Sequence, residues 1–132
     1  MRLKRYYILF IISILLVGLL GCDKKETFFN IDSADEITIM YGVSSYAYFG
    51  DDKDTIKKVI DSLNSLSFKE SDKEMNITTM FSIDLAKDGS QVAHLCMDDN
   101  GVFWVDGKTD SLEIDSGTLD YEVIKDIYKN GK

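Results

Sequence analysis

The sequence predicts an α+β fold, in which an antiparallel β-meander sheet carries two helices on one face. Several short segments alternate between apolar and polar residues, which is the period of half-buried strands, and turn residues separate most of them. Two other segments have the spacing of amphipathic helices. Strands joined by short turns pair antiparallel, and two helices with one apolar stripe each can cover only one face.

The length and composition favour a single folded domain. The chain has 132 residues, 45% of them hydrophobic, which is enough for one core but not for two. It contains no Pro and only 9 Gly, so collagen-like and Pro-rich classes are excluded. We expect the domain to span residues 35–132.

The first half of this domain contains the most regular helix pattern. Alternation over 36–43 predicts a strand, and Tyr46 and Tyr48 indicate a short second one. Asp51 or Asp52 can then cap a helix. The segment from residue 68 is polar and reads as a connection that can begin with a short strand. The apolar residues of the helix repeat every three or four positions: Ile56, Val59, Ile60 and Leu63.

Strands and a second helix make up the other half. Alternation predicts strands over 76–87 and 91–98, joined by a turn at Asp88-Gly89. Leu112 and Ile114 indicate a last strand, and residues 118–129 a helix. The apolar stripe of that helix is Tyr121, Ile124, Ile127 and Tyr128.

The turn at residues 99–101 determines a strand register. A three-residue loop with Gly101 in the left-handed conformation pairs Met97 with Phe103 and Leu95 with Val105, which makes one face wholly apolar. A two-residue loop would instead place Asp106 opposite Leu95, inside the core. We therefore expect the three-residue loop.

The first 22 residues have the order of a secretion signal. A basic start, Met1 to Tyr7, precedes an apolar stretch from Ile8 to Leu20. The 16 uncharged residues from Tyr6 to Gly21 reach roughly 24 Å as a helix. Because a hydrocarbon core is about 30 Å thick, a permanent membrane span is disfavoured.

The end of this stretch, Leu19-Leu20-Gly21-Cys22, resembles the lipobox of bacterial lipoproteins. The resemblance covers residues 1–22. It implies that residues 1–21 are a lipoprotein signal peptide, that the chain is cut before Cys22 and that this thiol carries a lipid. The protein would then be anchored at the extracytoplasmic face of the cell membrane, with 22–34 as lipidated Cys and tether. The alternatives are an ordinary secretion signal or a short membrane anchor with an incidental Cys.

The rest of the chain resembles the small acidic α+β domains of Gram-positive lipoproteins. The resemblance lies in the strand at 36–43 and the helices at 56–63 and 121–128. These patterns describe a fold, so no functional residue can be transferred from them.

The charge balance excludes one class of partner. Without Arg2, Lys4 and Arg5, 12 of the 15 basic residues remain against 23 acidic ones, a net charge of −11. A surface this acidic repels nucleic acid. We expect no nucleic-acid partner.

One strand carries a small group of reactive residue types. His94, Cys96 and Asp98 alternate and point to the same side, about 7 Å apart. The group can be a thiol beside an imidazole, a partial metal site or ordinary sheet residues. It has too few ligands for zinc, and no Gly-x-Ser-x-Gly elbow is present. We therefore predict no catalytic residue, no metal and no cofactor.

The predicted register sends Trp104 to the face of His94, away from the helices. Either this face is open and Trp104, His94 and Val102 form a partner surface, or the tether or a loop covers it. The leading hypothesis is a non-enzymatic envelope lipoprotein that binds a protein or peptide partner. The alternatives are a small-ligand or cation sensor, and an acidic inhibitor or immunity protein of a basic envelope enzyme.

Overall fold

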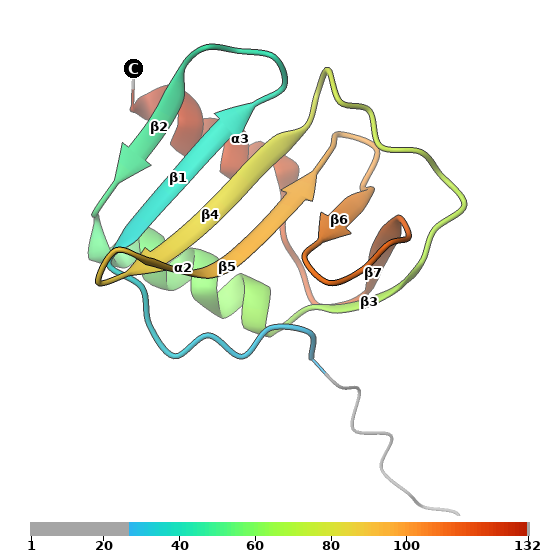
Figure 1. Cartoon of the computed structure of the whole chain (residues 1–132), viewed down its shortest axis with the longest axis horizontal. Helices are drawn as coiled ribbons and strands as arrows, with labels where there is room; N and C mark the ends of the chain where they lie inside the picture. The colour runs from blue at the N-terminus through green and yellow to red at the C-terminus, as the bar shows by residue number, and fades with distance from the viewer. Residues whose placement is uncertain (1–26, 132) are drawn as a thin grey trace, which may run out of the picture.

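The computed structural model describes residues 27–131, so the predicted signal peptide, the lipobox and Cys22 lie outside the described residues. The described part is one seven-stranded sheet with two helices (Figure 1). In chain order the elements are β1 (Glu36–Tyr41), β2 (Ala47–Gly50), α2 (Lys53–Asn64), β3 (Ser67–Glu70), β4 (Phe81–Lys87), β5 (Ser90–Met97), β6 (Phe103–Val105), β7 (Leu112–Ser116) and α3 (Tyr121–Asn130).

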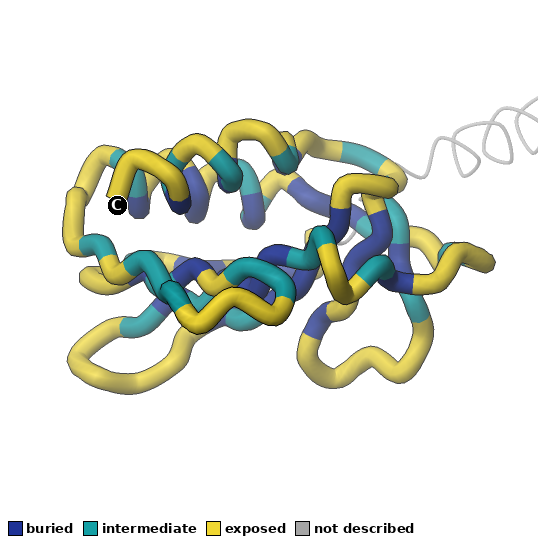
Figure 2. The backbone as a smooth tube through the Cα atoms, turned by 90° about the horizontal axis from the view of Figure 1, so that it is seen from above, coloured by how far each residue is buried: buried dark blue, intermediate teal, exposed yellow. Residues whose placement is uncertain are grey.

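The predicted α+β class is confirmed, and the sheet is antiparallel throughout. The strand order is β2-β1-β4-β5-β6-β7-β3, so β4 to β7 form a meander. The β3 strand departs from it, because α2 carries the chain from one edge of the sheet to the other. Both helices lie on the same face, in a separate layer (Figure 2).

Local sequence explains both helices. Asp52 is the N-cap of α2, and its Oδ2 accepts a hydrogen bond of 2.8 Å from the Thr55 N–H. The predicted apolar stripe of α2 is buried. Asp120 caps α3 in the same way through the Glu122 N–H. Here the predicted start at 118 is three residues too early, because the capping Asp precedes the first helical turn.

The predicted register between β5 and β6 is confirmed. Leu95 pairs with Val105 and Met97 with Phe103, and Gly101 has a φ of 75°. Apolar residues consequently line up across the sheet on the side of the helices. One such row crosses four strands and is almost wholly buried: Ile39, Ile83, Leu95 and Val105.

Residues 76–80 were expected to begin a strand but form a turn. The Asn76 side chain accepts a hydrogen bond from the Thr78 N–H at 3.2 Å, and the Asn76 backbone carbonyl accepts one from the Thr79 N–H at 3.2 Å. Such local bonds compete with strand pairing. As a result β4 begins only at Phe81.

The packed domain begins earlier than the predicted boundary at residue 35. The Phe28 N–H donates to the Leu66 carbonyl at 3.1 Å, and the Asn64 amide makes two 2.8 Å bonds with the backbone of Ile31. Phe29 and Ile31 are buried in the core. Residues 28–34 therefore belong to the domain rather than to a tether, although they have no regular period by which to recognise them.

Candidate functional site: the open face of the sheet

The sheet face opposite the helices, here called the open face, carries both polar and apolar side chains. Strand pairing aligns Phe49, Thr38, Asp84 and His94 in one row. It aligns Met40, Ser82, Cys96 and Trp104 in the next. The predicted common face of His94, Cys96 and Trp104 follows from this register.

A hydrogen-bonded array connects three of these side chains. His94 Nδ1 lies 2.7 Å from Asp84 Oδ1, and His94 Nε2 lies 3.8 Å from Cys96 Sγ. An ionised carboxylate only accepts hydrogen bonds, so Nδ1 carries the proton and donates to Asp84. In the neutral ring, Nε2 then carries the lone pair and lies toward the Cys96 thiol. This arrangement can accept a proton from the sulfur.

The thiol of Cys96 is held in its protonated form. Burial raises its pKa, and the carboxylates of Asp84 and Asp106 raise it further, while a hydrogen bond with Ser82 acts in the opposite direction. Cys96 is therefore a neutral thiol near pH 7. Any reaction of the sulfur requires a base, and His94 is in place for that role.

Asp98 does not join this array, contrary to the grouping drawn from the alternation. It is fully buried, and its carboxylate accepts from the N–H groups of Asn76, Asn100 and Val102 at 2.8 to 2.9 Å. Asp98 thus connects the β5–β6 turn to the loop before β4, which contains Asn76. The carboxylate that orients His94 is instead Asp84, which the sequence analysis missed.

The two alternatives for the open face are each realised in part. Trp104 is 43% exposed, and its Nε1–H donates to Ser111 Oγ at 3.3 Å. Val102, by contrast, is fully buried in a small cluster with Met75 and Cys96. The prediction that Val102 belongs to a partner surface is therefore wrong, because the loop before β4 covers it. At the other end of the face, Met40 is 43% and Phe49 76% exposed.

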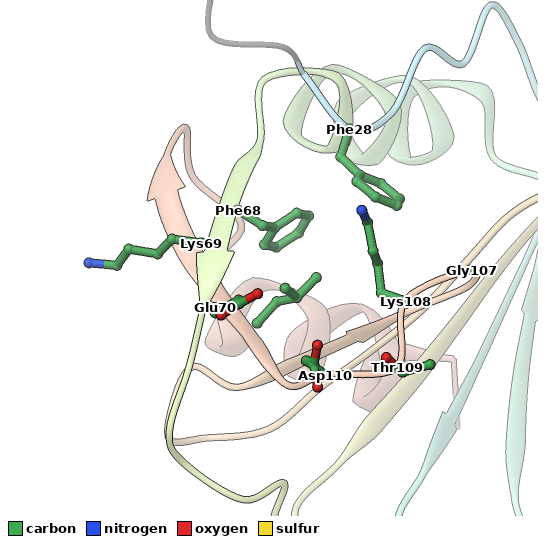
Figure 3. A pocket seen from close by; sticks show the side chains of 9 residues that line it. Phe28, Phe68, Lys69, Glu70, Gly107, Lys108, Thr109 and Asp110 are labelled. Atoms are coloured by element: carbon green, nitrogen blue, oxygen red, sulfur yellow. The ribbon is translucent and has the colours of Figure 1, made fainter.

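Two hollows lie on either side of the loop between β6 and β7. The Cys96 pocket, of about 350 Å³, is formed by His94, Cys96, Trp104 and residues 105–109. The Phe28 cleft, of about 470 Å³, lies toward the edge strand β3 (Figure 3). Lys108 lines both hollows and extends toward Phe28, with Nζ 5.7 Å from the ring centroid.

The Phe28 cleft combines an aromatic wall with charges of both signs. The Phe28 and Phe68 rings meet edge to face, 5.9 Å between centroids. Figure 3 shows Glu70 and Asp110 on the side of the cleft away from Phe28. A ligand that carries an apolar group and both charges would suit these walls.

Two further properties of the described part bear on function. Among residues 27–131, no three His, Cys, Asp or Glu side chains are grouped so as to hold a metal ion. In the same residues, neither helix has the length and apolar character needed to cross a membrane.

Comparisons with known proteins identify no relative. The chain matches no protein-family model, no curated protein and no solved structure.

Proposed function

We propose that this chain is a lipid-anchored extracytoplasmic lipoprotein that binds a protein or peptide partner through the open face of its sheet. The observation that carries the proposal is the exposure of Trp104, Met40 and Phe49 on a face that neither helix of residues 27–131 covers. Exposed aromatic side chains on a rigid surface are typical of binding sites, since aromatic residues dominate interface energetics.

The anchor would hold this domain close to the bilayer. The lipobox resemblance assigns the lipid to Cys22, and two acyl chains keep a protein on a membrane stably. Packing begins at Phe28, six residues later. Six residues span at most roughly 20 Å, even when fully extended. A partner would therefore be a protein at or near the membrane surface.

Charge favours a basic partner. The mature chain would carry a net charge of −11, and Asp84 and Asp106 lie beside His94 and the Cys96 pocket. Complementary charge speeds association and makes it sensitive to salt. An inhibitor or immunity protein of a basic envelope enzyme is one form that such binding would take.

Site-specific cross-linking tests the binding face. A photoreactive amino acid is placed at Trp104 or Phe49 and, as a control, at Val123, which is 52% exposed on α3. In membranes of a lipoprotein-producing host, we expect the first two positions to cross-link the same protein, with a yield that falls in high salt. Equal cross-linking from Val123, or none from the open face, would remove this face as the binding site.

The anchor is tested separately by intact mass. Wild-type protein from such a host should begin at residue 22 and carry a diacylglyceryl group, whereas Cys22→Ser should be neither cut there nor lipidated. A free Cys22 thiol in the wild type would refute the lipoprotein assignment. Cross-linking from Trp104 would remain meaningful in that case.

The Phe28 cleft favours a second candidate, a small-ligand sensor. Its aromatic wall and its Lys and Asp side chains match a zwitterionic ligand with an apolar group. Thermal unfolding in the presence of single amino acids tests this function. A ligand that raises the Tm of the wild type, but not of Asp110→Asn, would support it, because Asp110 lines this cleft and not the Cys96 pocket. Failure of all such ligands to raise the Tm would remove the amino-acid sensor as a candidate.

A further inference from the structure

The array of Asp84, His94 and Cys96 places a base beside a neutral thiol. The three side chains lie on adjacent strands of one sheet, which fixes their separations, and the imidazole bridges carboxylate and sulfur at 2.7 and 3.8 Å. Asp84 orients the ring, and Nε2 lies within hydrogen-bond distance of the Cys96 sulfur. Partner binding requires none of this arrangement.

Cys96 is buried, 8% exposed, and it lines the Cys96 pocket, through which a small molecule would reach the sulfur. Its volume of about 350 Å³ accommodates a group the size of an amino acid. Trp104 supplies a flat apolar wall, and Asp106 offers a negative charge for the ammonium group of an amino acid. Lys108 also lines the pocket, and its Nζ would turn from Phe28 to meet the carboxylate of the amino acid.

We propose that Cys96 is a site of thiol–disulfide exchange with small amino-acid disulfides, of which cystine is the simplest. His94 Nε2 takes the proton from Cys96, and the sulfur attacks one sulfur of cystine. The S–S bond of cystine breaks, and a new S–S bond joins Cys96 to one cysteinyl group. The departing cysteine takes the proton from the imidazole, so His94 returns to its neutral form.

Exchange suits this site better than acyl transfer does. Acyl transfer builds an oxyanion that needs aligned N–H donors. In the pocket wall, however, the Lys108 N–H already donates to the Val105 carbonyl at 3.1 Å. Disulfide exchange instead spreads its charge over sulfur atoms and does not need such donors.

The product would alter the open face. Cys96 is the only cysteine within residues 27–131, so no second thiol of this domain can displace the cysteinyl group. The modification would place a zwitterion next to Trp104, within the proposed binding surface. The extracytoplasmic location, which this inference takes from the proposed function, supplies an oxidising environment where disulfides persist.

The experiment treats the full-length protein, purified from membranes in detergent, with cystine near pH 7. We expect one cysteinyl adduct, located at Cys96 by peptide mass, and none in Cys96→Ser. Because peptide mapping identifies the position, the result does not depend on the state of Cys22. An unmodified Cys96 in folded protein that reacts only after denaturation would overturn the proposal.

Rates test the role of His94. We expect His94→Gln to slow the reaction with cystine at least tenfold near pH 7, and Asp84→Asn to slow it several-fold, with circular dichroism confirming that both variants are folded. At high pH, above the raised pKa of the thiol, His94→Gln and wild type should react at similar rates, because hydroxide then removes the proton. The groups facing this thiol are Ser82, Asp84, His94 and Asp106, and Lys108 lines the same pocket. Equal rates near pH 7 for both folded variants and the wild type would rule out base assistance.

Recognition of the amino-acid group is tested with a neutral disulfide. Lys108→Met should slow the reaction with cystine several-fold but leave the reaction with bis(2-hydroxyethyl) disulfide unchanged. If both reagents are affected equally, the pocket does not select a zwitterion, and that part of the proposal is wrong.

Discussion

The two faces of the sheet are built from the same strands but are stabilised differently. On the helix face, β1, β4, β5 and β6 contribute buried aliphatic residues, among them Ile39, Ile83 and Leu95. On the open face the same strands contribute Asp84, His94 and Trp104, which are partly exposed and hydrogen-bonded. Neighbouring residues of one strand thus serve different purposes.

The two faces contribute very different amounts to the free energy of unfolding. Burying one aliphatic side chain contributes about 1.5 to 3 kcal/mol, whereas a typical hydrogen bond contributes about 1 kcal/mol net. The helix face therefore determines whether the chain folds. The open face is under weaker structural constraint, which makes it the natural place for a function.

The largest expected effect concerns the helix layer. Ile60 lies on the buried stripe of α2 and is 7% exposed. Ile60→Asp should lower the free energy of unfolding by more than about 3 kcal/mol, because an unpaired carboxylate enters the core. Lys58→Asp, at an exposed position of the same helix, should cost less than about 1 kcal/mol. Similar losses for both in denaturant unfolding would mean that the helix face is not the main source of stability.

A second pair of variants compares the faces within β5. Leu95→Ala should cost about 2 to 5 kcal/mol, as is usual for a fully buried Leu. His94→Ala, one residue earlier, should cost about 1 kcal/mol or less, because its side chain is 26% exposed and it loses mainly the bond to Asp84. Urea midpoints of the two variants measure the contrast. A His94→Ala loss as large as that of Leu95→Ala would show that the polar array supports the fold.

Two glycines permit a smaller comparison. Gly117 and Gly107 both have left-handed backbone, with φ of 86° and 80°. A Cβ at Gly117 would collide with the backbone of Ser65 at the end of α2, whereas one at Gly107, in the loop of the Cys96 pocket, meets open space. Gly107→Ala should cost about 1 to 2 kcal/mol from its conformation alone, and Gly117→Ala roughly 1 kcal/mol more. Equal thermal shifts would mean that the chain next to α2 adjusts freely.

Local patterns were sufficient to predict most of the helix face. The 3.6-residue period located both helices, and the requirement for a left-handed Gly101 fixed the register of Leu95 and Val105. The position of β3 at the far edge could not be predicted, because it depends on where α2 crosses the sheet. The sequence does not indicate that residues 28–31 belong to the domain, because isolated hydrogen bonds to Leu66 and Asn64 leave no periodic pattern.

The candidate site depended on an irregularity that the sequence does not show. A regular two-residue hairpin at Asp88-Gly89 would pair Ile83 with His94. Instead, a register shift after Leu85 leaves Val92 without a partner residue and brings Asp84 opposite His94. The shift keeps Ile83 opposite Leu95 on the helix face. The register that packs the helix face therefore also places Asp84 beside His94 on the open face.

At Trp104 we expect a substitution to affect partner binding more than folding. Because the side chain is 43% exposed, Trp104→Ala should lower stability by only about 1 to 2 kcal/mol, well below a fully buried aromatic residue. The same substitution should abolish most cross-linking from Phe49, if both residues contact one partner.

Trp104 is the only Trp, so the fluorescence of the protein reports on this residue alone. Acrylamide should quench it readily in the folded protein. Resistance to quenching, together with a loss above about 3 kcal/mol in the alanine variant, would place Trp104 in the core and leave the open face without its main binding residue.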